Sequence, residues 1–225
     1  MTYMTENGPV QDPTFTIAAN SRKTIRVNDA HPALDLSTKV HGTLPLIAER
    51  SMYWDSGHGE ACHDSIGLSA PHHIFYLPGG MCQPYDYDAQ QADMETYTLV
   101  QNPNDRAVTV VLTYVDMGAT VVANIPANAR MTFNMSDVFG NTPTASGITV
   151  ECKTSGCGIM VEKANYVMKR TMGMETIGAF SDTIVPALSA KKVRKSGGDT
   201  GRMKALESRL KERLIRGGVW GKLGK

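Results

Sequence analysis

The chain has 225 residues, a formal net charge of +1 and 41% hydrophobic residues. This is enough material for one large domain or for two of about 100 residues each. It lacks the run of about 18 apolar residues that a membrane-spanning helix needs. Its first ten residues have neither the basic nor the apolar region of a signal peptide.

The near-neutral net charge conceals an uneven distribution. From Lys191 onward there are twelve Lys/Arg and three acidic residues, and the preceding part carries 11 basic and 19 acidic residues. A basic tail on an acidic body is a natural contact for an acidic polymer or an anionic membrane surface. The alternative is a solvated tail without a partner, and nucleic acid is not the partner we expect.

Four blocks of sequence recur in the same order at offsets of 108–113 residues. Residues 1–10, 17–31, 45–54 and 63–71 reappear as residues 112–122, 125–139, 158–167 and 174–182. A constant order with small differences in offset indicates a tandem repeat, with the differences placed in loops.

The first repeat is incomplete, because Met1 already matches Leu112 and the segment 72–111 has no earlier counterpart. A start at an internal strand position predicts an N-terminally truncated sequence, which would also account for the missing signal peptide. The predicted organisation is a partial repeat over 1–71, a complete repeat over 72–185, a Gly/Ser-containing basic linker over 186–200, and an amphipathic helix over 201–217 with a basic tail to 225.

Short segments with alternating apolar residues dominate the complete repeat. Apolar side chains fall on one face of the first such segment at Val108, Val110, Leu112 and Tyr114. Further β-rich segments follow at a spacing of roughly ten residues, separated by Gly, Pro and Asn. Such strands without intervening helices predict an all-β fold of tandem antiparallel β-sandwiches of immunoglobulin-like size.

The C-terminal segment 201–217 has a helical pattern instead. Apolar residues recur every three or four positions at Met203, Leu206, Leu210 and Leu214, with basic residues on the other faces. Docking on the sandwich or pairing with a second copy is the simpler interpretation. An anionic membrane surface is the alternative contact.

Residues 48–67 hold the densest group of polar side chains in the chain. His58, His63 and Asp64 are of the types that bind zinc. The second repeat has no His or Cys in the matching span, which favours a structural loop over a metal site. The shared residues predict a carboxylate–cation pair and a packed aromatic ring in each repeat: Glu49, Arg50 and Tyr53 in the first, and Glu162, Lys163 and Tyr166 in the second.

Four cysteines permit three disulfide pairings. We expect Cys152 to pair with Cys157 across a Ser-Gly turn, and Cys62 to pair with Cys82. Four free thiols are the alternative. Disulfides would place the chain in an oxidising compartment.

The loop 76–97 combines aromatic and acidic residues of the kind that contact sugars or bind calcium through oxygen atoms. Its candidate ligand-binding residues are Tyr85, Asp86, Tyr87, Asp88 and Tyr97. An irregular loop between strands is the alternative interpretation. No nucleophile elbow or phosphate-binding loop is present, so we do not expect an enzyme.

Five segments together resemble a repeat of uncharacterised secreted bacterial surface proteins: YTLVQNPNDRAVTVVLTY, IAANSRKTIRVND, LSTKV, LIAERSMYW and HDSIG. The motifs of that repeat are QNPxD, SRxTIxVND, STKV, AERxMY and GHDSIG. The resemblance implies an all-β, extracellular or wall-associated module that usually occurs in tandem, and it transfers no catalytic residue. This chain departs from it by the GEAC interruption of the last motif, the loss of that motif in the second repeat, and the basic tail.

The sequence therefore predicts a non-enzymatic structural or adhesive module, secreted or displayed at a cell surface, with neighbouring repeats as partners. A module that binds carbohydrate or cell-wall polymer is the first alternative. A metal-dependent hydrolase that uses His58, His63 and Asp64 is the second. No cofactor is expected for the leading prediction, and calcium or zinc belongs to the alternatives.

Overall fold

The computed structural model describes residues 1–84, 93–140 and 142–182. The predicted linker, the predicted C-terminal helix and the ligand candidates Tyr85, Asp86, Tyr87 and Asp88 lie outside the described residues. Within them, no helix has both the length and the apolar character to cross a membrane.

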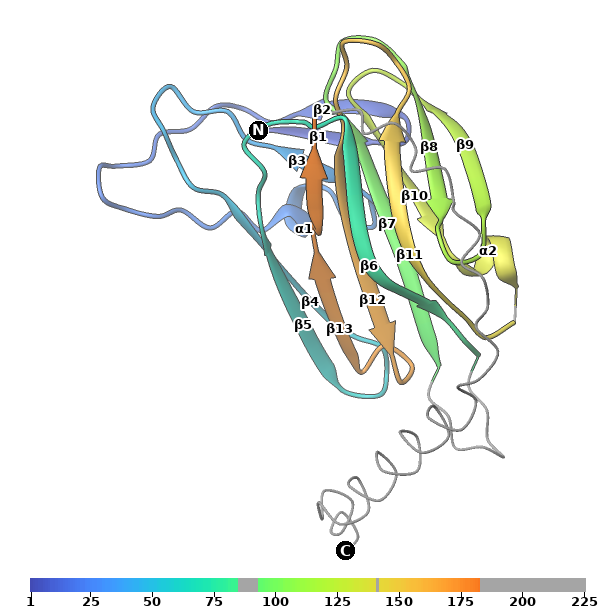
Figure 1. Cartoon of the computed structure of the whole chain (residues 1–225). Coiled ribbons are helices and arrows are strands. Elements are labelled where there is room, and N and C mark those ends of the chain that lie inside the picture. Colours follow the sequence, from blue (N-terminus) through green and yellow to red (C-terminus); the bar gives the residue numbers. More distant parts are fainter. Residues whose placement is uncertain (85–92, 141, 183–225) are drawn as a thin grey trace, which may run out of the picture. The chain divides into compact units, whose positions relative to one another are not determined.

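Residues 72–182 form a sandwich of two antiparallel sheets, which confirms the predicted all-β fold (Figure 1). The order of the first sheet is β14-β6-β11-β8-β9, formed by Ala179–Ser181, Ile74–Cys82, Thr144–Cys152, Val108–Tyr114 and Ala119–Ile125. The order of the second sheet is β10-β7-β12-β13, formed by Ala129–Asn134, Met94–Asn102, Met160–Val167 and Met172–Thr176. A single helical turn, α2 (Ser136–Phe139), follows β10.

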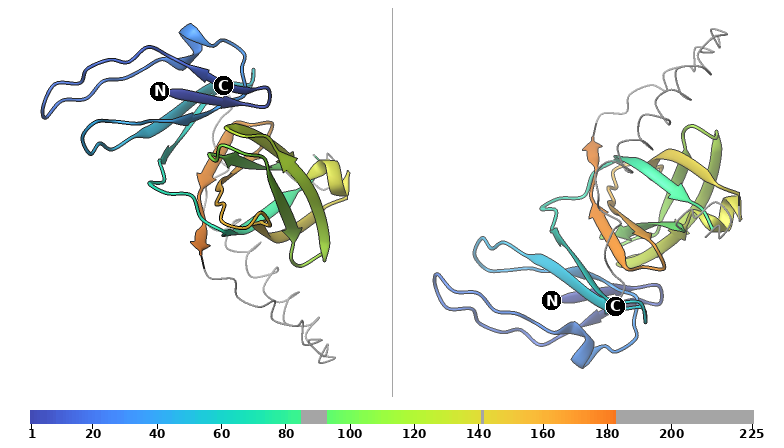
Figure 2. Two further views of the ribbon diagram at one scale, coloured as in Figure 1. Left: turned by 90° about the horizontal axis from the view of Figure 1, so that it is seen from above. Right: turned by 90° about the horizontal axis from the view of Figure 1, so that it is seen from below.

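The space between the two sheets holds the hydrophobic core, and Figure 2 shows the sheets end-on around it. Strand β8 illustrates how the sequence forms this core, because each of its alternate residues from Val108 to Tyr114 is buried. Strand β7 contributes Val100 to the same core, and β12 contributes Val161. The outer faces of β7 and β12 are therefore free to contact other parts of the chain.

The first 71 residues contain two smaller sheets. One has the order β2-β1-β3, formed by Gly8–Gln11, Thr2–Thr5 and Ser37–Lys39. The other is the hairpin of β4 (Glu49–Asp55) and β5 (Glu60–Ile66). A short helical turn, α1 (Val27–Ala30), lies between β2 and β3.

Elements of the two predicted repeats occur at equivalent positions. Hairpin β1–β2 matches β8–β9, and hairpin β4–β5 matches β12–β13. Strand β3 pairs with β1 as β11 pairs with β8, so that Tyr3 lies opposite Thr38 and Tyr114 opposite Ile148. Asn20 and Asn128 even share a left-handed backbone conformation, with φ of 52° and 49°. The boundary between residues 71 and 72 stays a prediction, since residues on both sides of it belong to one compact unit.

The first 71 residues have no counterpart of β6 or β7. In the second repeat β7 lies between β10 and β12, and residues 17–26, which match β10 and the loop before it, form no strand. A strand needs a hydrogen-bonded neighbour, so the absence of a β7 equivalent explains this difference. It also explains why Tyr3 and Met4 are the buried hydrophobic residues of this part of the chain, whereas the core cluster lies in the second repeat.

Candidate functional site

The hairpin β4–β5 from the dense polar stretch packs on strand β13 of the sandwich. Neighbouring residues of a strand point to opposite faces, so the hairpin divides its polar residues between two sides. Arg50, Trp54 and His63 lie on the side that is partly or fully buried. Glu49, Tyr53 and Asp64 lie on the exposed side, where the Tyr53 side chain is 79% accessible to solvent.

An arginine and two glutamates form the centre of this contact, which we call the joint: Arg50, Glu162 and Glu175, together with His63 and Tyr166. The guanidinium group of Arg50 donates to Glu162 Oε2 at 3.0 Å and to Glu175 Oε1. The Glu175 side chain is only 1% exposed. Burial raises the pKa of Glu162, and the positive charge of Arg50 opposes this shift. The positive charge of Arg50 therefore offsets the energetic cost of placing the carboxylates of Glu162 and Glu175 away from water.

His63 completes the joint from strand β5. Its Nε2 lies 3.2 Å from the Tyr166 hydroxyl, and its Nδ1 lies 3.0 Å from Glu175 Oε2, although these last two atoms are not aligned as a hydrogen bond. The side chain is 5% exposed. Burial, and then the charge of Arg50, lower the pKa of His63, so the joint favours the neutral imidazole.

Aromatic contacts extend the joint toward the turn of hairpin β12–β13. The Trp54 indole N–H donates to the Arg170 carbonyl oxygen at 2.7 Å, and its ring lies edge-on to Tyr166 at 5.5 Å between centroids. A Cβ atom on Gly173 would lie 3.0 Å from the Trp54 ring, so any larger side chain there would crowd this packing. Arg170 also donates to the Tyr97 hydroxyl at 2.8 Å. Tyr97, a predicted ligand-binding residue, therefore makes a contact within the surface of the sandwich.

The joint contains groups that elsewhere act as acids and bases. His63 and Glu175 are both buried beneath the hairpin. Neither of the two pockets described below contains a residue of the Arg50–Glu162–Glu175–His63–Tyr166 set. A general base must come within hydrogen-bond reach of the proton that it takes. The arrangement fits a structural contact between two parts of the chain.

The structure does not bring the predicted metal ligands together. His63 points into the joint, Asp64 points to the opposite, exposed face of β5, and His58 lies exposed in the turn before that strand. Among the residues that the structure describes, no group of three or more His, Cys, Asp or Glu side chains is placed to hold a metal ion. Strand alternation is the physical reason, since adjacent residues of β5 face apart.

The predicted carboxylate–cation pairs are wrong in their partners. Glu49 and Arg50 are adjacent in one strand and point apart, so Arg50 pairs with Glu162 of the other repeat instead. Lys163 points into the sandwich, where its ammonium group donates to the carbonyl oxygens of Pro78 and Gly79. The predicted packed aromatic ring is present at Tyr166 of the second repeat. The matching Tyr53 of the first repeat is exposed instead.

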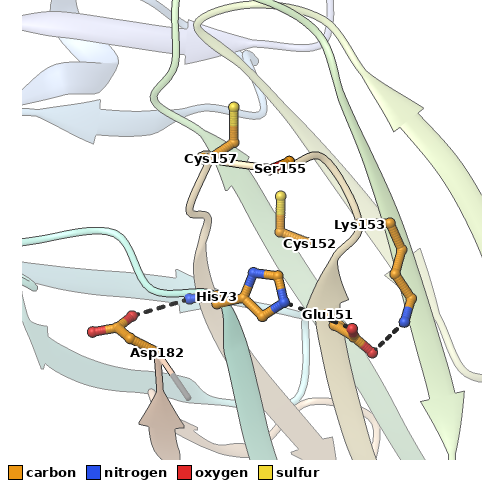
Figure 3. Close-up of a pocket in the computed structure, with 8 residues that line it drawn as sticks. His73, Glu151, Cys152, Lys153, Ser155, Cys157 and Asp182 are labelled. Atoms are coloured by element: carbon orange, nitrogen blue, oxygen red, sulfur yellow. Dashed lines mark hydrogen bonds and ion pairs between the residues drawn. The ribbon is translucent and has the colours of Figure 1, made fainter. Parts of the chain in front are cut away.

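The four cysteines are free thiols, and neither predicted disulfide is formed. Cys62 is exposed on β5, whereas Cys82 lies in the sandwich core. Cys152 and Cys157 are buried beside a pocket of about 460 Å³ that His73, Glu151, Lys153, Ser155 and Asp182 also line (Figure 3). Burial raises the pKa of Cys152, which favours the unreactive thiol form.

Several charged residues of that pocket lie within ion-pair distance of one another, whereas His73 Nε2 has no hydrogen-bond partner among the described residues. Lys153 Nζ lies 2.6 Å from Glu151 Oε2, and His73 Nε2 lies 3.7 Å from Glu151 Oε1. The backbone N–H of His73 donates to Asp182 (Figure 3). The rim of this pocket is therefore ion-paired, and Arg106 Nε donates to Cys157 Sγ at 3.1 Å.

A second, shallow pocket lies on the hairpin itself. Its lining comprises Tyr53, Asp55, Glu60 and Cys62 from the exposed face of the hairpin, together with Trp54 and Ala61. Aromatic faces beside acidic groups are typical of surfaces that contact sugars. Among the described parts of the chain, this groove is most similar in composition to the predicted glycan-binding surface.

Sequence reasoning did not single out three residues of the joint and its border: Glu175, Trp54 and Arg170. The internal repeat contained a signal for Glu175, because the block 174–182 matches 63–71 and so places this glutamate at the position of Asp64. An acid retained in both copies is a candidate for a shared contact. Its partner was not predictable, since it comes from the other repeat.

Comparison with known proteins adds little. No protein-family model and no curated protein matches the chain. The solved structure of Thermotoga maritima 1070 is 10% identical to this chain, with a TM-score of 0.40. The match covers 50% of this chain and 97% of the Thermotoga maritima chain. The Anabaena sensory rhodopsin transducer is 17% identical, with a TM-score of 0.30, over 43% of this chain and 91% of its own. These scores are too low to bear on function.

Proposed function

We propose that this chain is a non-enzymatic structural or adhesive module of a secreted or surface-displayed bacterial protein, whose partners are neighbouring repeats. The strongest support is the position of the densest polar stretch, residues 48–67, which packs against the second repeat. The half-buried Arg50 pairs with Glu162 and Glu175, and the buried His63 lies beside Glu175, so the residues that suggest an active site contact the other repeat. These polar side chains contribute to the contact between the repeats, which supports an architectural role.

The location at a cell surface is tested directly by labelling. Antibodies raised against residues 72–182 are applied to intact and to permeabilised cells of the organism that produces the protein. We expect labelling of intact cells, removed by brief external protease treatment. Labelling only after permeabilisation would contradict the proposal.

Glycan binding is the second candidate function, and the groove at Tyr53, Trp54, Asp55 and Glu60 favours it. A panel of glycans and peptidoglycan fragments, tested with the full chain, measures it. The matched pair is Tyr53→Ala, which removes the exposed ring of the groove, and Glu49→Gln, which alters the same hairpin face outside it. Binding that Tyr53→Ala abolishes and Glu49→Gln retains would establish the second function; no binding to the panel would exclude it for those ligands.

A further inference from the structure

Strand β4 has an open edge. Among the described strands it pairs with β5 alone, whereas the equivalent strand β12 pairs with β13 on one side and with β7 on the other. An open edge presents unpaired backbone N–H and C=O groups and can accept a further strand. The position beside β4 is therefore empty among the described strands. The matching position beside β12 of the second repeat is occupied by β7.

The register of the filled position transfers directly to the empty one. Lys163 lies opposite Thr98, Ala164 opposite Tyr97 and Tyr166 opposite Glu95. The repeat matches Arg50 to Lys163 and Tyr53 to Tyr166. A strand with the sequence of β7 would therefore lie antiparallel to β4, with the position of Tyr97 beside Ser51.

Apolar residues that are buried in the second repeat are exposed at the matching positions of the first. Three pairs of matched residues differ in the same way: Ile17 and Ile125, Val40 and Val150, and Leu46 and Ile159. The first member of each pair is exposed, at 43%, 38% and 44%, and the second is 0% exposed. The buried members share the core cluster with Val100 of β7. Covering the exposed members removes apolar surface from water, which favours association.

We infer that the open edge of β4 is an acceptor site for an extended β7-type strand of a neighbouring repeat. This inference rests on the proposed function as a repeat module and names its partner. A second copy of this chain is not the donor, because its own β7 is hydrogen-bonded on both sides within the sandwich. The interaction is β-strand addition, in which main-chain hydrogen bonds supply affinity and alternate side chains supply register.

A synthetic peptide with the sequence of residues 93–104, DMETYTLVQNPN, tests the site on the full chain. The peptide carries a fluorophore at its N-terminus and a photoreactive phenylalanine analogue in place of Tyr97. We expect saturable binding by fluorescence anisotropy and crosslinks to residues 49–55. The control peptide has Leu99→Pro, which removes a backbone N–H from the strand, and should bind at least about tenfold more weakly.

Three results would overturn the inference. They are equal binding of the two peptides, crosslinks outside β4, and a concentration-dependent dimer of the chain that excludes the peptide, which would make a second copy the occupant of the edge. Failure of peptide binding would leave surface labelling of intact cells unaffected, so the two proposals fail separately.

Discussion

At the scale of single residues, the direction of a side chain from its strand decides what it does. Arg50 and His63 enter the joint, while Glu49 and Asp64, one position away from each, face outward. Types of residue and their spacing suggested a metal site or two local ion pairs. The strand geometry instead distributes the same residues between a buried contact and an exposed face.

His63 predicts a dependence of stability on pH. Because its pKa is lowered in the folded protein, the unfolded chain takes up a proton first as the pH falls through about 6.5. The free energy of unfolding should therefore decrease between about pH 8 and about pH 5.5, by roughly 1 kcal/mol more than in His63→Gln. Urea denaturation at each pH measures this. Equal slopes for wild type and His63→Gln would refute the assignment.

Gly67 and Gly178, each preceded by Ile, occupy matched positions of the two repeats but need different backbone conformations. Gly178 has φ of 62°, and a Cβ there would collide with the Tyr76 carbonyl oxygen. Gly67 does not have a positive φ, and its Cβ would lie 3.3 Å from the Ala48 carbonyl oxygen. We expect Gly178→Ala to cost about 2 kcal/mol or more of unfolding free energy and Gly67→Ala less than about 1 kcal/mol. Similar losses in the two variants would contradict this difference.

At the scale of elements, the hairpin β4–β5 is held to the sandwich by a small contact with definite parts. The Trp54 ring packs on Gly173, and the joint lies beside it. The hairpin therefore separates from β13 if this close approach is blocked, while the sandwich core remains intact.

Gly173→Leu should release the hairpin. The larger side chain occupies the position of the Trp54 ring, so the fluorescence of Trp54 should shift to longer wavelength as the ring becomes hydrated. The measurement uses a Trp220→Phe background, because the chain has two tryptophans. Met174→Leu, at an exposed position of the same strand, is the control and should leave the emission unchanged. An unchanged spectrum for Gly173→Leu would show that Trp54 does not pack there.

Strands were predictable from the sequence where alternation was strong. The pattern from Val108 to Tyr114 placed β8 and its buried face correctly. The docking of β4–β5 was not predictable, because it depends on the outer face of another sheet more than 100 residues away in sequence. Local patterns report which side chains share a face, and they do not report which distant face those side chains meet.

At the scale of the whole molecule, the two repeats differ in how many buried hydrophobic residues each contains. The core cluster draws its buried residues from the second repeat, and Tyr3 and Met4 are the buried hydrophobic residues of the first. Chain segments with little apolar burial cannot offset the entropy lost on folding. The second repeat should therefore serve as the scaffold on which the first is ordered.

Dividing the chain tests this dependence. A fragment of residues 72–182 should unfold in one cooperative transition with the heat-capacity change of a folded domain. A fragment of residues 1–71 should show no such transition by calorimetry, because its two small sheets lack a core of their own. A cooperative transition in the shorter fragment would contradict this account of the repeats.

Arg50 and Glu162 join the two repeats, and a double-mutant cycle measures the coupling between them. Unfolding free energies are measured for wild type, Arg50→Met, Glu162→Gln and the double variant, with Glu49→Gln replacing Arg50→Met in a parallel control cycle. We expect a coupling energy of about 1–3 kcal/mol for Arg50 with Glu162, and additivity within about 0.3 kcal/mol for Glu49 with Glu162. Additive effects of Arg50→Met and Glu162→Gln would show that the joint does not exist in solution.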